Sequence, residues 1–250
     1  MLQNFDMRRL SRIASLLAAL LATGIIARPQ GIAVNGRVEL VQENGESRVA
    51  NKSNVVVWLT PVEAQTPASI PAPAPQQHPQ LMQKDKSFKP HLLVVPAGTL
   101  VDFPNHDPFF HNVFSLFEGK RFDLGLYESG ADRQVNFDRP GISYIFCNIH
   151  PEMSAVIIAL STPYYGVSDR SGRITIPDVP PGEYVVHVWH ERSLPATLRN
   201  STREIAISES SKSLGTLHLQ EAGELPLAHK NKYGQDYETP TPASPGYEQR

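Results

Sequence analysis

Short apolar stretches alternate with polar residues along most of the chain, which is the period-two pattern of β-strands. The stretch 55–59 is a continuous β-branched and aromatic run, and 37–41 alternates between apolar and polar residues. Further strand-like runs lie at 92–95, 99–103, 135–137, 142–146, 155–160, 173–176, 184–189, 205–207 and 217–219. Strands this close together, with turn residues between them, predict an all-β protein made of β-sandwiches.

Composition supports this prediction and narrows the possible partners. The 250 residues include 22 prolines and 16 glycines, which favour short strands and many turns over long helices. The formal net charge is only −2, which gives no reason to expect nucleic acid as a partner.

The first 27 residues have the pattern of an export signal. Arg8, Arg9 and Arg12 form a basic start, and an apolar stretch follows over 13–27. That stretch is short for a membrane span but suits the apolar region of a signal peptide. We expect a signal peptide over 1–27, a periplasmic or secreted protein and no membrane span in the mature form. The alternative is an N-terminal membrane anchor.

The remaining chain divides into segments of different character. Residues 63–80 are rich in proline and predict a linker, whereas 82–162 resume the strand pattern. The two strands of 31–62 cannot be stable alone, but together with those of 163–219 they can form a small second β-sandwich. Residues 220–250 have no periodicity and predict a disordered tail.

One sequence motif indicates that the two outer segments belong to the same domain. In 171–184 a glycine precedes a short alternating strand, and Pro-Gly-x-Tyr follows. This pattern resembles the carboxypeptidase regulatory-like, or transthyretin-like, domain, whose opening strands are similar to 36–59 here. The resemblance implies a discontinuous domain of 31–62 and 163–219, into which 82–162 is inserted.

The candidate chemistry lies in the middle segment. Cys147 is the single cysteine, so the chain forms no internal disulfide, and a lone cysteine is usually a small buried apolar side chain. Its neighbours indicate more, because His150 and Met153 follow within the same short loop and His111 lies upstream. A thiolate, two imidazoles and a thioether are the ligands that suit copper cycling between Cu(I) and Cu(II).

The same segment resembles the cupredoxins, in particular plastocyanin and amicyanin. The matching stretches are 88–90, 95–99, Asn105 and the pair His111 and Asn112. Cys-x-x-His-x-x-Met is similar to the short ligand loop of amicyanin, including the proline after the histidine, although Glu152 replaces a phenylalanine.

The cupredoxin resemblance implies a Greek-key β-sandwich over 82–162 with a single type 1 copper ion. The implied ligands are His111, Cys147, His150 and Met153, and Asn112 is implied to brace the two ligand loops by hydrogen bonds. One alternative is a cupredoxin-like sandwich that has lost its metal. A structural zinc site is a further alternative, although it would prefer more cysteine or histidine and no methionine.

Three other histidines have simpler interpretations. His106 is expected to be a solvated loop residue, and the alternative is a position near the site. His187 and His190 flank Trp189 in the second sandwich without a third candidate ligand, so we expect them to be structural.

These observations predict an electron carrier that is not an enzyme. Its partners would be redox proteins such as a c-type cytochrome or a periplasmic dehydrogenase. A copper oxidase or nitrite reductase would need a second copper site built from several histidines, which the sequence does not offer. The alternative function is a copper carrier or sensor without a role in electron transfer.

Overall fold

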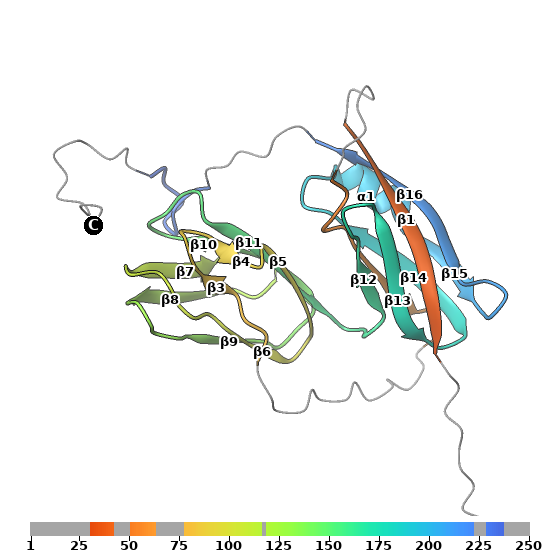
Figure 1. Ribbon diagram of the computed structural model, residues 1–250, viewed down its shortest axis with the longest axis horizontal. Helices are drawn as coiled ribbons and strands as arrows, with labels where there is room; N and C mark the ends of the chain where they lie inside the picture. The colour runs from red at the N-terminus through yellow and green to blue at the C-terminus, as the bar shows by residue number, and fades with distance from the viewer. Residues whose placement is uncertain (1–30, 43–50, 64–77, 117–118, 223–228, 238–250) are drawn as a thin grey trace, which may run out of the picture. The chain divides into compact units, whose positions relative to one another are not determined.

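The computed structural model describes residues 31–42, 51–63, 78–116, 119–222 and 229–237 (Figure 1). The predicted signal peptide 1–27 and most of the predicted linker, 64–77, lie outside the described residues. The described residues form sixteen strands and one short helix, so the prediction of an all-β fold is confirmed. No helix in these ranges has the length and hydropathy to cross a membrane.

One β-sandwich combines strands from both sides of the middle segment. Its three-stranded sheet has the order β13-β1-β16 and its four-stranded sheet the order β12-β2-β14-β15. The strands are β1 (Ile32–Gln42), β2 (Val56–Pro61), β12 (Tyr165–Val167), β13 (Arg173–Val179), β14 (Gly182–Trp189), β15 (Arg203–Ile207) and β16 (Ser213–Glu221).

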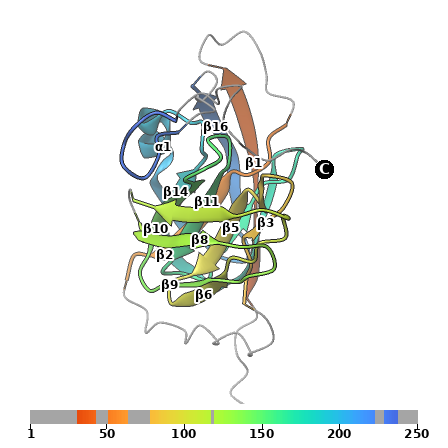
Figure 2. The same cartoon turned by 90° about the vertical axis from the view of Figure 1, so that its left-hand side faces the viewer.

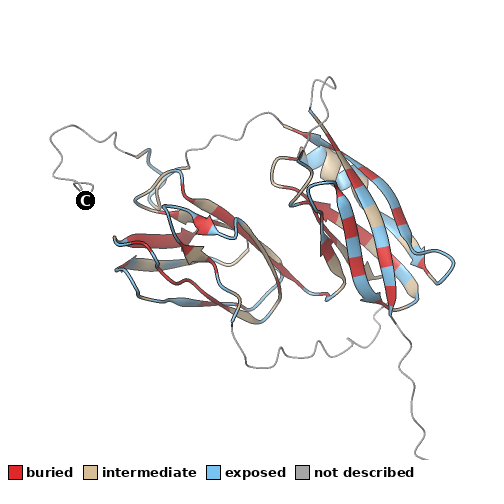
Figure 3. Ribbon diagram, in the orientation of Figure 1, coloured by how far each residue is buried: buried red, intermediate tan, exposed pale blue. Residues whose placement is uncertain are grey.

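The alternating sequence pattern explains how these two sheets pack. Side chains along a strand point to opposite faces in turn, and in β1 this buries Val34, Val38 and Leu40. They share one apolar cluster with Leu59 of β2 and Val186 of β14, so both sheets contribute to a single core. The alternation is visible as red and pale bands along the strands of Figure 3.

The middle segment forms its own set of sheets (Figure 2). A five-stranded sheet has the order β5-β11-β10-β7-β8, and two-stranded sheets pair β6 with β9 and β3 with β4. The strands are β3 (Met82–Gln83), β4 (Phe88–Lys89), β5 (Leu92–Pro96), β6 (Thr99–Asp102), β7 (His111–Ser115), β8 (Phe122–Tyr127), β9 (Gln134–Phe137), β10 (Gly141–Cys147) and β11 (Ser154–Leu160). They enclose a separate apolar cluster that includes Phe103, Tyr127 and Ile145.

The strand pairings support the proposal of an inserted middle domain. β1 pairs with β13 and, in parallel, with β16, while β2 pairs with β12 and β14. The Leu59 N–H also donates a hydrogen bond of 2.9 Å to the carbonyl of Tyr164. The chain therefore leaves this sandwich and returns to it at neighbouring positions.

Six elements were not predicted from the sequence, and three of them are the short strands β3, β4 and β12. The helix α1 (Pro195–Ser201) was not predicted; it begins with a proline at its first turn, and its Leu198 packs against the core of the sandwich. β7 was not predicted because all five of its residues are buried, including His111, so no alternation marks it. β8 was also not predicted, because its buried and exposed residues do not alternate.

The prediction of a disordered tail over 220–250 requires a correction. β16 extends to Glu221, and 229–237 are placed against the middle domain by hydrogen bonds of their own. These polar contacts have no periodicity, so the sequence pattern gave no sign of them. The other residues after 222 lie outside the described ranges.

Candidate metal centre

The short loop between β10 and β11 holds three of the predicted ligands. Cys147 is the last residue of β10, and β11 begins directly after Met153. The Cys147 N–H donates to the Met153 carbonyl at 3.2 Å, and the Met153 N–H donates to the His150 carbonyl at 3.1 Å. These bonds close the loop tightly and keep its side chains at one end of the sandwich.

His111 reaches the same place from the neighbouring strand. It is the first residue of β7, which pairs with β10 so that Cys147 lies opposite Val113. The Asn148 N–H donates to the carbonyl of Asn112 at 2.8 Å, which joins the two ligand-bearing segments through the backbone.

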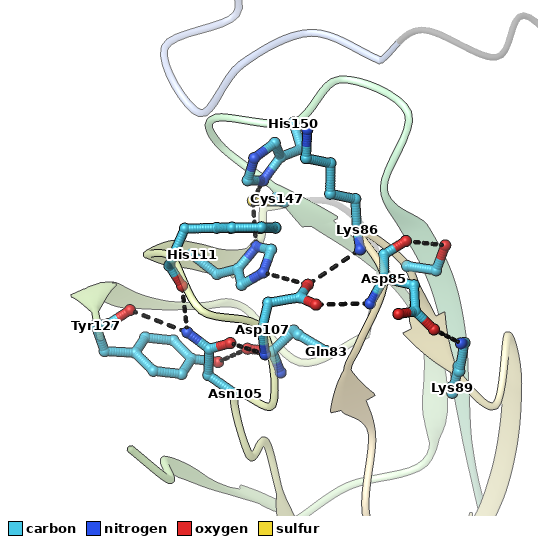
Figure 4. A network of polar contacts seen from close by, with 12 residues as sticks. Gln83, Asp85, Lys86, Lys89, Asn105, Asp107, His111, Tyr127, Cys147 and His150 are labelled. Atoms are coloured by element: carbon cyan, nitrogen blue, oxygen red, sulfur yellow. Dashed lines mark hydrogen bonds and ion pairs between the residues drawn. The ribbon is translucent and has the colours of Figure 1, made fainter. Parts of the chain in front are cut away.

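Three of the four predicted side chains, those of His111, Cys147 and His150, converge (Figure 4). Cys147 Sγ lies 3.6 Å from His111 Nδ1 and 3.5 Å from His150 Nδ1, and the three atoms all lie within 4.8 Å of one another. Typical metal bonds of about 2.0 Å to nitrogen and 2.3 Å to sulfur sum to more than the two sulfur–nitrogen separations. The donor atoms can therefore share one ion.

Met153 is a buried thioether in the same loop, a donor type that fits copper better than zinc. Its side chain is 1% exposed and belongs to the same apolar cluster as Cys147. A thioether is a soft ligand that suits copper, whereas closed zinc sites use cysteine and histidine. The four residues would hold a copper ion, and the apolar surroundings would limit the access of water to it.

Burial shifts the pKa values of the three converging side chains. It lowers the pKa of His111, an effect that the neighbouring Asp107 partly offsets. Burial and the proximity of His111 lower the pKa of His150 to about 4. Both imidazoles are thus neutral near pH 7, with a ring nitrogen free to bind metal. Burial also raises the pKa of the Cys147 thiol, so a metal ion must displace its proton.

Asp107 is a functional residue that the sequence analysis missed. Its buried carboxylate lies 2.9 Å from His111 Nε2, which fixes His111 with Nδ1 facing Cys147. It also accepts the backbone N–H groups of Asp85 at 2.6 Å and Lys86 at 3.0 Å. Although burial opposes it, these hydrogen bonds lower the pKa of Asp107. Its position four residues before His111 was the available signal.

The role predicted for Asn112 is fulfilled by its backbone rather than its side chain. The side-chain amide donates to Asp123 Oδ1 at 2.6 Å and to the Gly125 carbonyl at 3.0 Å, both in β8. The predicted brace between the ligand loops is instead the bond from the Asn148 N–H to the Asn112 carbonyl. The amide therefore fixes β7 to its other neighbour in the sheet.

The remaining candidate histidines lie apart from this cluster. His106 is exposed, and the His187 ring stacks on Trp58 with a centroid separation of 5.1 Å. His190 is buried, and its Nδ1 lies 3.2 Å from Ser193 Oγ. Within the described residues, His111, Cys147 and His150 are the only group of three His, Cys, Asp or Glu side chains close enough to hold one ion.

Replacing Asp107 with Asn should weaken copper binding and raise the reduction potential. The asparagine side chain would turn an N–H₂ group toward the backbone N–H groups that the carboxylate accepts. It would also remove the negative charge that makes His111 a stronger ligand for Cu(II). Loss of such a partner typically reduces metal affinity by about 10–100-fold. Competition titration and voltammetry measure both effects.

Asp85→Asn is the matched control, because within the described residues the Asp85 carboxylate pairs with the exposed Lys89 amine and not with His111. It should keep the affinity and potential of the unaltered protein. Equal behaviour of the Asp107 and Asp85 variants would contradict a role for Asp107 at the metal.

Comparisons with known proteins give structural neighbours only. No protein-family model matches the chain, and no curated protein matches it. The purple cupredoxin of Nitrosopumilus maritimus is 22% identical with a TM-score of 0.30, over 33% of this chain and 99% of that one. Amicyanin of Paracoccus versutus is 20% identical with a TM-score of 0.32, over 41% of this chain and 97% of that one.

A third neighbour is the copper-containing nitrite reductase NirK of Thermus scotoductus SA-01. It is 25% identical with a TM-score of 0.33, over 38% of this chain. The match spans only 25% of the length of that enzyme.

Proposed function

We propose that this chain is an exported type 1 copper protein that carries single electrons between redox partners. The observation that carries the proposal is the convergence of Cys147 Sγ, His111 Nδ1 and His150 Nδ1 within 4.8 Å. Met153 lies buried in the same cluster. Copper held there would supply one-electron chemistry by changing between Cu(I) and Cu(II).

The surroundings of the ligands favour electron transfer because they resist rearrangement. His111 is held by the buried Asp107, and the loop with Cys147 and Met153 is closed by backbone hydrogen bonds. Ligands fixed in this way keep the same positions in both oxidation states, so little reorganisation accompanies the transfer of an electron.

His150 is the ligand suited to pass electrons to a partner. It is less buried than His111 and Cys147, and the neighbouring Ile149 is 40% exposed. The Phe109 ring lies 5.5 Å from the His150 ring, measured between centroids. Such a small apolar edge suits the brief contacts of redox proteins, and we propose a c-type cytochrome or a periplasmic dehydrogenase as partner.

Copper titration of the purified protein tests this function. We expect one equivalent of Cu(II) to produce an intense visible band that disappears reversibly on one-electron reduction. Binding to the folded state should also raise the thermal unfolding midpoint, since a ligand at 100 times its dissociation constant stabilises by about 2.7 kcal/mol. A colourless protein with no shift in midpoint would contradict the proposal.

A copper carrier or sensor is the second candidate, because it would use the same ligands. It would bind Cu(I) preferentially, lack the intense colour and fail to reduce and reoxidise reversibly. Voltammetry of the copper-loaded protein separates the two functions: a reversible couple supports the electron carrier, and its absence with retained Cu(I) binding supports the carrier or sensor.

We also propose that the second sandwich is a carboxypeptidase regulatory-like domain interrupted by the copper domain. The pairing of β1 with β16 and of β2 with β14 supports this arrangement. The motif residues 171–184 span the turn before β13, the whole of β13, the next turn and the first residues of β14.

A further inference from the structure

Residues 229–237 lie against the proposed copper loop and bond to it directly. The Tyr237 hydroxyl donates to the carbonyl of Cys147 at 2.7 Å, and the Lys232 N–H donates to Asn148 Oδ1 at 2.9 Å. The first bond is made to a proposed ligand residue and the second to the residue that follows it.

The same segment also reaches the strand that carries His111. Lys232 Nζ lies 2.8 Å from Asp123 Oδ2, and Asp123 Oδ1 accepts the side-chain amide of Asn112 at 2.6 Å. The ion pair is partly shielded, since the Lys232 and Asp123 side chains are 21% and 35% exposed. Lys232 thus links the Cys147 loop to β8 and, through Asn112, to β7.

Aromatic contacts of His229 accompany these polar bonds. The His229 ring lies 4.3 Å from the Phe146 ring and 6.1 Å from the Phe114 ring, measured between centroids. Tyr237 packs edge-on against His229 at 5.3 Å. Phe146 immediately precedes Cys147 in β10, so the contact covers the backbone that presents the thiol.

Hydrogen bonds and an ion pair within 229–237 give the segment the shape that these contacts need. Asn231 Oδ1 accepts the N–H groups of Tyr233 at 2.9 Å and Gln235 at 3.0 Å, and Lys230 pairs with Asp236. The resulting turn brings Lys232 and Tyr237 to the same side, although Tyr233 between them is 73% exposed.

We propose that residues 229–237 form a clasp on the copper-binding loop, in which Tyr237 and Lys232 are positioning residues. The inference rests on the proposed copper function and adds to it a part of the chain outside both sandwiches. The clasp holds the Cys147 carbonyl and the Asn148 side chain in place, so the loop keeps its form when the metal changes charge or leaves.

Two consequences follow from this arrangement. The loop after Cys147 is hydrogen-bonded to the clasp, and the clasp is also paired with Asp123 of β8. Because a loop fixed in this way opens less often, the clasp should slow the loss of bound copper. The positive end of the Tyr237 hydroxyl dipole also points toward the residue that supplies the thiolate. This polarity favours the electron-rich reduced site, so removal of the hydroxyl should lower the reduction potential.

The test uses Tyr237→Phe in the full chain, with Tyr233→Phe as the matched control. Both variants lose one phenolic hydroxyl from the same segment. The Tyr237 hydroxyl bonds to the loop, whereas Tyr233 contacts Lys232 through its ring, which phenylalanine keeps. We expect Tyr237→Phe to release Cu(I) to a chelator about 10-fold faster, as for other partners that orient metal ligands. Its potential should fall and its visible band shift, whereas Tyr233→Phe should match the unaltered protein. Identical release rates, potentials and spectra for both variants would overturn the clasp.

Hydrogen exchange of the metal-free protein separates failure of the clasp from failure of the copper function. Faster exchange of the amides in 148–153 in Tyr237→Phe, but not in Tyr233→Phe, supports the clasp independently of copper. Unchanged exchange in both variants overturns it and leaves the copper function standing. A protein that binds no copper refutes the proposed function without altering the exchange result.

Discussion

Cys147→Ser should abolish the visible absorption of the copper-loaded protein completely. The band arises from charge transfer between a thiolate and Cu(II), and Cys147 is the only residue of the chain that can supply a thiolate. A serine hydroxyl is a hard, weakly acidic oxygen that cannot replace a soft ligand. An optical spectrum of the variant with one equivalent of Cu(II) measures the result, and a persisting band would refute the assignment of Cys147.

His106→Ala is the control for this experiment. His106 precedes His111 by only a few residues but is exposed and outside the group of converging side chains. Its removal should leave the band unchanged. Circular dichroism of the metal-free Cys147→Ser protein should show the same β-signal as the unaltered chain, which separates loss of the ligand from loss of the fold.

Leu59→Ala should destabilise the discontinuous sandwich by about 2–5 kcal/mol and leave the copper site intact. Leu59 is fully buried in the core that unites strands from both outer segments, whereas the proposed ligands belong to another apolar cluster. The variant loses apolar contacts and leaves a cavity, so the urea midpoint of this sandwich should fall.

The chain provides separate reporters for its two domains. Hydrogen exchange of the backbone amides in β2 and β14 follows the discontinuous sandwich. The visible band follows the proposed copper site. We expect these amides to lose protection at a lower urea concentration in Leu59→Ala while the band persists, and Val62→Ala, exposed at 47%, to stay within about 0.5 kcal/mol of the unaltered protein. Simultaneous loss of both signals would contradict separate domains.

The sequence predicted the convergence of His111, Cys147 and His150, and it did so largely because three of the four candidate ligands share one short loop. The spacing of Cys147, His150 and Met153 constrains them to a single turn between two strands. The alternating runs likewise predicted most strands, because apolar and polar residues alternate along a strand that has one buried face. β7 has no exposed face, so its sequence carries no such signal.

The groups that support the ligands were harder to predict than the ligands. Asp107 acts only because the turn before β7 points its carboxylate at His111, and a single acidic residue near a histidine is common. Tyr237 and Lys232 belong to a polar stretch whose contacts are made with residues distant in the chain. Such contacts depend on the tertiary fold, and local pattern contains no information about them.

The parallel pairing of β1 with β16 predicts an order of folding for the chain. β1 is made early, but its neighbour β16 follows the whole middle segment and four further strands. The middle segment contains its own pairings at shorter separations and should form first, because contacts distant in sequence are slow to close. Its folding removes 82–162 from the free chain between Leu59 and Tyr164 and so shortens the loop that the outer strands must close. We therefore expect the folded middle segment to promote formation of the sandwich that surrounds it.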